Sequence, residues 1–287
     1  MFTIAKILLP VDFSARSADA ADAATEVAEH FHSEITLLHV LARGFDAPLA
    51  IPAQRTVSHG FTREEAEERL KEFRCSEWRR FGVHRVLREG DPARTIVEYA
   101  ESEQIGLIMM PTHGYGPFRR LLLGSVTAKV LHDAKCPVWT AVHSQEQLSH
   151  ITAKPRRIAS AVNLGPDGSN VLRWSDRLSR EFGAQLGIIY VAPLDPRSEE
   201  YYALPEWRDR VLSRANAEVA ELLQTDGING EIQIEVGSIP DAVVERTRNL
   251  QADLLVVGRG GHDGVTGRLP TNTYAIIRNA PCPVLGV

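Results

Sequence analysis

The chain has 287 residues, which is longer than a typical single-core domain and fits two domains of about 140 residues each. Hydrophobic residues make up 44% of it and charged residues 24%, as in ordinary globular proteins, which excludes a largely disordered chain. The net charge of −5, with Lys and Arg scattered along the sequence, argues against a DNA or RNA partner, and no apolar run is long enough to span a membrane.

The first half of the chain alternates short apolar runs with stretches of helical spacing. The apolar runs, which we expect to be strands, cover residues 6–11, 34–40, 84–88, 105–110 and 137–142. Ser14 is a typical N-cap for an Ala-rich helix after the first strand. Further helices are expected over residues 62–81, from the turn at 90–92 up to residue 103, and over residues 125–134.

The second half repeats this plan. Its expected strands cover residues 157–163, 185–191, 231–236, 254–257 and 284–287. Both halves end on the same step, Cys136-Pro137-Val138 in the first and Cys282-Pro283-Val284 in the second. We therefore expect two domains, residues 1–143 and 157–287, joined by a polar linker over residues 144–156.

Strands that alternate with helices and are apolar throughout indicate a parallel sheet covered on both faces. The expected fold class is therefore α/β, with two tandem, doubly wound, five-stranded parallel-sheet domains. Ligands of such sheets bind at the carboxyl ends of the strands, where the strand order reverses, beside the first and fourth strands. In the first half these places are Asp12 and the loop that starts at Pro111.

The loop after the fourth strand has the pattern of a phosphate cradle. Gly114 is followed by nine residues and then by Gly124-Ser125 at the expected start of a helix. Unpaired backbone N–H groups and the helix dipole would face an anion there, and glycines permit a close approach. The Ser125 hydroxyl would either cap the helix or bind a phosphate.

These features resemble the universal stress protein family over nearly the whole chain, once per half. That family has an Asp at the end of its first strand, a Gly-x-x-Gly-(nine residues)-Gly-Ser/Thr motif after its fourth strand, and a Pro-Val step near its end. The resemblance implies an adenine nucleotide alpha hydrolase-like fold with strand order 3-2-1-4-5. It also implies an ATP or AMP site, with or without Mg²⁺, whose candidate residues are Asp12, Val40, Gly114, Gly124 and Ser125.

One glycine of the family motif is missing in the first half. Pro111 stands in its place, which removes a backbone N–H and fixes φ. His113, in the same loop, is either an added charge near the phosphates or a solvated loop residue.

In the second half Gly258 restores the glycine that Pro111 replaces, but the other elements of the site have decayed. We therefore expect no adenosine selectivity there, with weak anion binding as an open alternative. Asn163 replaces the Asp, and Val191 stands where Val40 does in the first half. The Gly-Ser step becomes Pro270-Thr271, or Thr271-Asn272 if the loop keeps its full length. The residues retained as weaker candidates are Asn163, Val191, Gly258, Gly261 and Thr271.

Each candidate in the first half also has a purely structural interpretation. Asp12 is equally suited to cap the turn before the first helix, Gly114 to permit a tight turn, and Gly124-Ser125 to form a plain N-cap. Two hypotheses about function follow. Either the chain is a stress-response module regulated by adenine nucleotide, or it is a nucleotide-free scaffold for a protein partner, in which both sites have decayed.

An enzyme is the third hypothesis, and the sequence argues against it. A related adenine-nucleotide hydrolase would need a Ser-Gly-Gly-x-Asp-Ser loop after the first strand, where this chain has Pro10-Val11-Asp12-Phe13-Ser14. Walker, Gly-x-Ser-x-Gly and paired-carboxylate patterns are also missing. We therefore expect no catalytic residues, with slow hydrolysis of bound ATP as a lesser alternative.

Partners and compartment complete the expectations. Family members commonly dimerise through their last strands, so residues 138–142 and 284–287 are expected to pair antiparallel within one chain, and a homodimer of tandem chains is a further option. The N-terminus lacks a signal-peptide pattern, which favours a cytoplasmic protein. The three cysteines are too few for a disulfide framework, and no metal site is expected, because His30 and His32 lack a third ligand at a suitable spacing.

Overall fold

The computed structural model describes residues 2–42, 61–74, 78, 82–113, 123–141, 154–193, 205–260 and 269–287. Its strands are β1 (Lys6–Pro10), β2 (Glu34–Leu41), β3 (Val83–Glu89), β4 (Leu107–Met110), β5 (Val138–Thr140), β6 (Arg157–Val162), β7 (Gln185–Pro193), β8 (Glu231–Gly237), β9 (Leu254–Val257) and β10 (Val284–Gly286). Its helices are α1 (Ala15–Phe31), α2 (Arg63–Glu72), α3 (Pro92–Ser102), α4 (Ser125–Asp133), α5 (Pro166–Phe182), α7 (Pro205–Asp226), α8 (Ile239–Asn249) and α9 (Thr271–Asn279).

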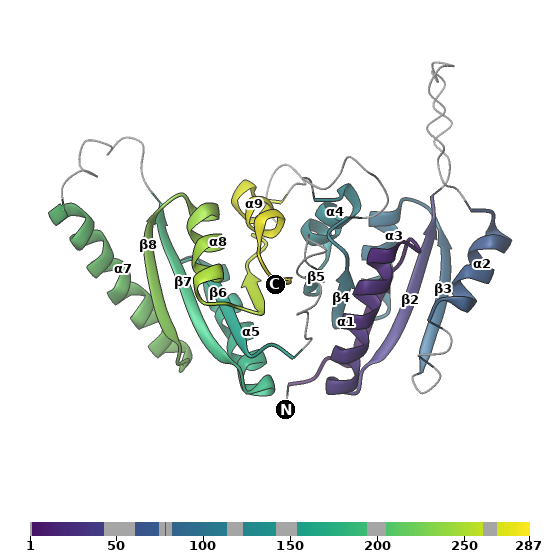
Figure 1. Ribbon diagram of the computed structural model, residues 1–287, viewed down its shortest axis with the longest axis horizontal. Coiled ribbons are helices and arrows are strands. Elements are labelled where there is room, and N and C mark those ends of the chain that lie inside the picture. Colours follow the sequence, from purple (N-terminus) through teal and green to yellow (C-terminus); the bar gives the residue numbers. More distant parts are fainter. Residues whose placement is uncertain are drawn as a thin grey trace, which may run out of the picture.

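The strands form one ten-stranded sheet in the order β3-β2-β1-β4-β5-β10-β9-β6-β7-β8. Each half thus has the order 3-2-1-4-5, with every pair inside a half parallel. The halves meet at β5 and β10, which pair antiparallel with Leu285 opposite Trp139. Figure 1 shows the two halves side by side, with β5 near the middle of the molecule. The α/β class with two tandem doubly wound units is therefore confirmed.

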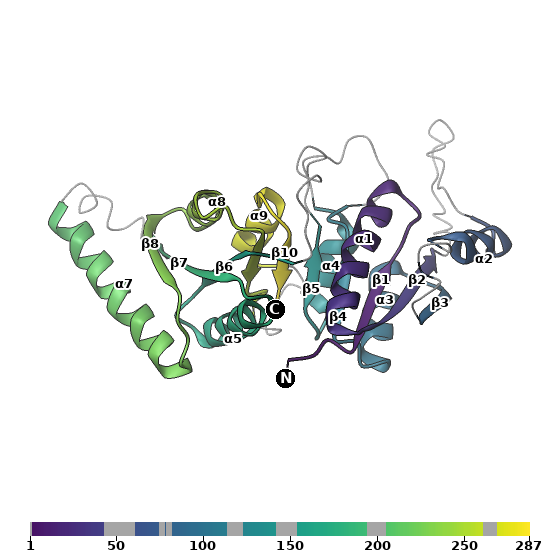
Figure 2. The ribbon, with the colours of Figure 1, turned by 60° about the horizontal axis from the view of Figure 1, so that its bottom comes forward.

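Helices cover both faces of this sheet, because the strands are apolar on both sides. The buried side chains of α1, α2, α5 and α7 belong to one core, and those of α3, α4, α8 and α9 belong to the other. Alternate residues of a strand serve the two cores: Ile7 and Leu9 lie in the first and Leu8 in the second. Figure 2 shows α1 in front of the sheet of the first half and α3 behind it.

Local signals explain where the helices around the first-half site begin. Ser14 is the N-cap of α1, and its side chain accepts from the backbone N–H of Ser17. Asp91 caps α3 in the same way, with Pro92 as the first helical residue. Because these caps follow the carboxyl ends of β1 and β3, the helix N-termini lie at the edge of the sheet where ligands bind in this fold class.

One expected helix is shorter than the sequence pattern suggested. The helix over 62–81 is α2, which ends at Glu72, because Arg74 adopts a left-handed backbone conformation (φ 52°). The Arg74 guanidinium donates to the carbonyl of Ala18 at 3.1 Å, and Trp78 donates its indole N–H to Thr25 at 2.7 Å. These contacts with α1 favour a turn over a longer helix.

Aromatic side chains reinforce the junction between the halves. The Phe2 ring lies 5.6 Å from that of Phe31 in α1 and 5.1 Å from that of Trp174 in α5, both edge-on. His30 lies 3.4 Å from the Glu181 carboxylate of the other half. The two halves therefore share a packed interface besides the β5–β10 ladder. No helix in the described ranges is both long and apolar enough to cross a membrane.

Candidate functional site

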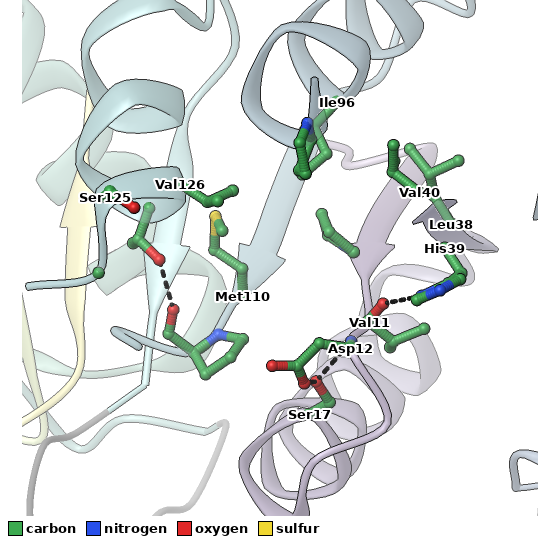
Figure 3. A pocket seen from close by; sticks show the side chains of 15 residues that line it. Val11, Asp12, Ser17, Leu38, His39, Val40, Ile96, Met110, Ser125 and Val126 are labelled. Carbon is green, nitrogen blue, oxygen red and sulfur yellow. Dashed lines mark hydrogen bonds between the residues drawn. The ribbon is translucent and has the colours of Figure 1, made fainter. Parts of the chain in front are cut away.

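A cavity of about 260 Å³ opens at the carboxyl ends of β1 and β4, where the strand order of the first half reverses. Its lining comes from the end of β1, from β2, from the start of α3, from the end of β4 and from the first turn of α4 (Figure 3). Among the candidate residues, Asp12, Val40, Pro111, Gly124 and Ser125 are brought together around it. Gly114 lies outside the described residues.

Asp12 uses one carboxylate oxygen for the turn and leaves the other available. Its Oδ1 accepts from the Ser14 amide at 3.0 Å, from the Ser14 hydroxyl at 2.6 Å and from the Ser17 hydroxyl at 2.6 Å. Its Oδ2 makes no hydrogen bond to a described residue, and in Figure 3 one oxygen points away from Ser17 into the cavity. The capping interpretation is therefore correct for Oδ1, and Oδ2 remains as an acceptor for a ligand.

The end of β2 forms the wall opposite α4. Leu38 and Val40 present apolar side chains there, and His39 lies between them in the chain with only 7% of its surface exposed. Its Nδ1 lies 2.7 Å from the Val11 carbonyl, and because a carbonyl only accepts, Nδ1 carries the proton. Burial lowers the pKa of His39, and the hydrogen bond to Val11 and the charge of Asp12 oppose this shift only in part.

Sequence reasoning missed His39. The available signal was a titratable side chain among the apolar residues 37–41, at the strand end that borders the site. A buried histidine on the α1 face of the sheet holds the end of β1 against β2, so its role is to position the backbone of Val11 next to Asp12.

The start of α4 has the features of an anion cradle. Gly124 is the N-cap, no side chain caps the helix in the described residues, and helix geometry leaves the N–H groups of the first turn without intrahelical partners. A Cβ at Gly124 would lie 3.1 Å from the His113 Cα and 3.2 Å from the Thr112 carbonyl oxygen, so the close approach of the two segments favours glycine. Ser125 is exposed, and its hydroxyl bonds to no described residue. The interpretation of Ser125 as a capping side chain is therefore wrong.

Pro111 and His113 are part of the support beneath α4. The Pro111 carbonyl accepts from the Thr127 hydroxyl at 3.0 Å, which ties the end of β4 to the first turn of the helix. His113 is 1% exposed, with its Nδ1 3.1 Å from the Thr112 hydroxyl. The interpretation of His113 as a solvated loop residue is wrong, because the close approach of Gly124 covers it.

The second half has a matching cavity of about 390 Å³ with different chemistry. Asn163 and Val191 line it, and the Asn163 Oδ1 accepts from the Gly165 amide at 3.0 Å, as Asp12 accepts from Ser14. The Thr273 hydroxyl donates to the Gly258 carbonyl at 3.2 Å, which matches Thr127 and Pro111.

This match settles which residues replace Gly124-Ser125. Pro270 is the N-cap of α9 and Thr271 its first residue, so the equivalent step is Pro270-Thr271 and the Thr271-Asn272 alternative is wrong. Thr271 is exposed but is not among the residues that line the cavity. Gly261 lies outside the described residues.

Arg259, which sequence reasoning left unassigned, turns away from the second-half cavity. It follows β9 in the glycine loop, yet its guanidinium donates to the carbonyls of Leu131 at 2.9 Å and Ala134 at 2.8 Å, in the first half. Its surface is 8% exposed, and burial lowers its pKa. The described side chains of His, Cys, Asp and Glu form no group of three or more that could hold a metal ion.

The comparisons with known proteins agree with this architecture. A family model described as the universal stress protein family matches residues 3–141 and again residues 154–287. The chain is 27% identical over 299 residues to a universal stress protein of Mycolicibacterium smegmatis, covering 98% of this chain and 96% of that protein. It is 35% identical over 135 residues to one of Methanocaldococcus jannaschii, covering 46% of this chain and 79% of that protein.

A solved structure extends the likeness to the fold of the whole chain. The crystal structure of a universal stress protein from Archaeoglobus fulgidus matches 99% of this chain and 98% of its own, with a TM-score of 0.69 and 21% identity. At that identity the likeness concerns the fold alone. With the family model matched twice, the chain belongs to the universal stress protein family and carries two copies of its domain in tandem.

Proposed function

We propose that the first-half cavity binds an adenine nucleotide, ATP or AMP, and that the chain is a stress-response module regulated by this binding. One observation carries the proposal: the available Oδ2 of Asp12 and the uncapped first turn of α4 border the same cavity. A carboxylate oxygen accepts from ribose hydroxyls, and a helix N-terminus binds phosphate. Because Asp12 and the first turn of α4 border one cavity, the cavity suits a ligand that carries both ribose hydroxyls and phosphate.

The remaining wall suits a base. Leu38, Val40, Ile96 and Met110 give the cavity an apolar side between Asp12 and α4. Apolar walls with a few convergent polar groups are typical of small-molecule sites. The choice of adenine over another base comes from the family to which the chain belongs, as does the option of Mg²⁺ with the phosphates.

Binding without turnover is part of the proposal. Asp12 is the one carboxylate among the described residues that line the cavity, and three hydrogen bonds to its Oδ1 hold it in the turn. In the proposal its Oδ2 serves as an acceptor for the ribose hydroxyls of the ligand. In this proposal a nucleotide in the cavity acts as a signal that changes conformation or partner affinity.

The second candidate function is a nucleotide-free scaffold, and the second half favours it. Asn163 presents an amide instead of a carboxylate, and Pro270 begins α9 where the first half has glycine. If the first-half cavity has lost its ligand as well, the ten-stranded sheet remains as a platform for a protein partner or a second copy of the chain.

Calorimetric titration of the purified chain with ATP and Mg²⁺ distinguishes the two functions, together with mass analysis of any co-purified nucleotide. The test variants are Asp12→Ala and Ser125→Ala, with Ser102→Ala at the far end of α3 as a matched control. We expect saturable binding at one site per chain that both test variants weaken and the control leaves unchanged. Lack of binding by the wild-type chain, with no co-purified nucleotide, would contradict the nucleotide function and favour the scaffold.

A further inference from the structure

Arg259 joins the second half to the helix that forms the first-half cradle. It lies in the loop after β9, and its backbone N–H donates to the Val287 carbonyl at 3.1 Å, which fixes its position beside β10. The side chain then crosses the junction between the halves. It bonds the carbonyls of Leu131 and Ala134 through one guanidinium nitrogen and that of Cys136, at 3.2 Å, through another.

The Leu131 and Ala134 carbonyls are at the carboxyl end of α4, and Cys136 follows the helix. The last carbonyls of a helix have no intrahelical partner, and the helix dipole favours a cation there. Arg259 supplies both the donors and the charge, in a buried place where water would otherwise have to solvate the carbonyls.

Strand β10 leaves room for the side chain of Arg259. A Cβ at Gly286 in β10 would lie 2.9 Å from both Cγ and Cδ of Arg259 and 3.1 Å from Cδ2 of Leu131. Glycine at this position therefore makes room for the arginine stem where it passes from one half to the other.

The other end of α4 borders the proposed nucleotide site. The helix has nine residues, so it is about 14 Å long and moves as one rigid rod. Among the described residues, the start of the helix is tied to the end of β4 by the hydrogen bond from the Thr127 hydroxyl to the Pro111 carbonyl and by the one from the Gly124 N–H to the Thr112 carbonyl, at 2.8 Å. A change in the position of the carboxyl end consequently changes where the N–H groups of the first turn point.

We propose that Arg259 is a positioning residue for the first-half site, through which the second half aims the α4 cradle at the phosphates of the bound nucleotide. This inference rests on the proposed function. The coupling runs from the second half to the first, because the residue that corresponds to Arg259 is Thr112, whose short side chain bonds to its neighbour His113. Arg259 should therefore affect the binding of phosphates and not of the nucleoside.

The experiment compares ATP with adenosine in calorimetric titrations of the full chain. Its variants are Arg259→Met and Arg259→Lys, with Phe2→Ala as a control that weakens the junction without contacting α4. We expect Arg259→Met to weaken ATP binding about tenfold and adenosine binding by less than about twofold. Arg259→Lys should keep part of the ATP affinity, because the positive charge remains. It should lose the rest, because an ammonium group reaches fewer carbonyls than a guanidinium group does. Phe2→Ala should leave the ratio of the two affinities unchanged.

Hydrogen exchange without nucleotide tests the same idea independently of binding. We expect faster exchange of the amides of residues 126–130 in Arg259→Met than in the wild type or in Phe2→Ala. Equal losses for ATP and adenosine, or unchanged exchange in α4, would overturn the inference. If the wild-type chain binds no ATP, the proposed function fails, and the exchange experiment alone decides whether Arg259 holds α4. If Arg259→Met does not fold, Arg259→Lys is tested in its place. We then expect the amides of residues 126–130 to exchange faster than in the wild type, and the ATP affinity to fall by less than about tenfold.

Discussion

Replacing Asp12 with Asn separates the two roles of its carboxylate. An Asn side chain keeps Oδ1 as an acceptor and replaces Oδ2 with an NH₂ donor. The second half already shows that Asn supports this turn, because the Asn163 Oδ1 accepts from the Gly165 amide at 3.0 Å, the distance between the Asp12 Oδ1 and the Ser14 amide. We therefore expect Asp12→Asn to fold normally and to lose ligand affinity.

The magnitudes follow from the hydrogen bonds. Hydrogen bonds to a charged acceptor are worth about 1.5–3 kcal/mol and neutral ones about 0.5–1.5, so weakening the three bonds to Oδ1 at this half-buried site should lower the free energy of unfolding by about 1–2 kcal/mol. Asp12→Ala leaves the same three donors without an acceptor and should cost about 3 kcal/mol. Loss of one charge-assisted bond from Oδ2 to the ligand should weaken ATP binding roughly 10- to 150-fold.

Urea denaturation and calorimetric titration of the wild type, Asp12→Asn and Asp12→Ala measure both effects. Binding must be measured on folded protein only. The titrations are therefore made at a urea concentration well below the midpoint of unfolding and at a temperature where both variants are folded. Wild-type ATP affinity in Asp12→Asn would refute the assignment of Oδ2 to the ligand. Equal destabilisation of the two variants would refute the assignment of Oδ1 to the turn.

Three further changes test separate parts of the site. Ser125→Ala should change the free energy of unfolding by less than about 0.5 kcal/mol, since the hydroxyl bonds to no described residue, while weakening binding of ATP more than of adenosine in the same titrations. Gly124→Ala should lower the free energy of unfolding by about 1–3 kcal/mol, because its Cβ would press on His113; an unchanged urea midpoint would show that the loop gives way. The folded-state pKa of His39 lies below its ordinary value of 6.5, so the unfolded chain takes up the proton first, and the stability contributed by neutral His39 is full above that pH and declines below it. His39→Gln should flatten this decline below about pH 6.5, as urea denaturation at a series of pH values will show.

Much of the fold could be predicted because its signals are local. Short runs such as Ile7 to Leu9, apolar at consecutive positions, indicate strands covered on both faces, since both sides of each strand must avoid water. Ser14 and Asp91 mark helix starts because their side chains satisfy N–H groups a few residues away. The place of Asp12 at the ligand-binding edge followed from its position at the carboxyl end of the first strand of a doubly wound sheet, with the strand order implied by the resemblance to the family.

The tertiary structure decided what depends on contacts between distant residues. Helix α2 ends early because Arg74 and Trp78 bind α1, and His113 is buried because Gly124 closes over it, neither of which a local pattern expresses. Which oxygen of Asp12 bonds within the turn, and which one faces the cavity, depends on side-chain geometry that a sequence motif does not specify.

Arg259 is the clearest case. In the sequence it sits inside a glycine-rich loop, where a cation suggests an anion site. In the structure two of its guanidinium nitrogens donate to carbonyls of the other half, more than a hundred residues away, as with Leu131. The sequence by itself determined the elements and the edge of the sheet where a ligand would bind. Only the packing of the two halves decided which polar groups face that ligand and which hold the structure together, because each buried donor bonds to whichever acceptor the fold brings within reach.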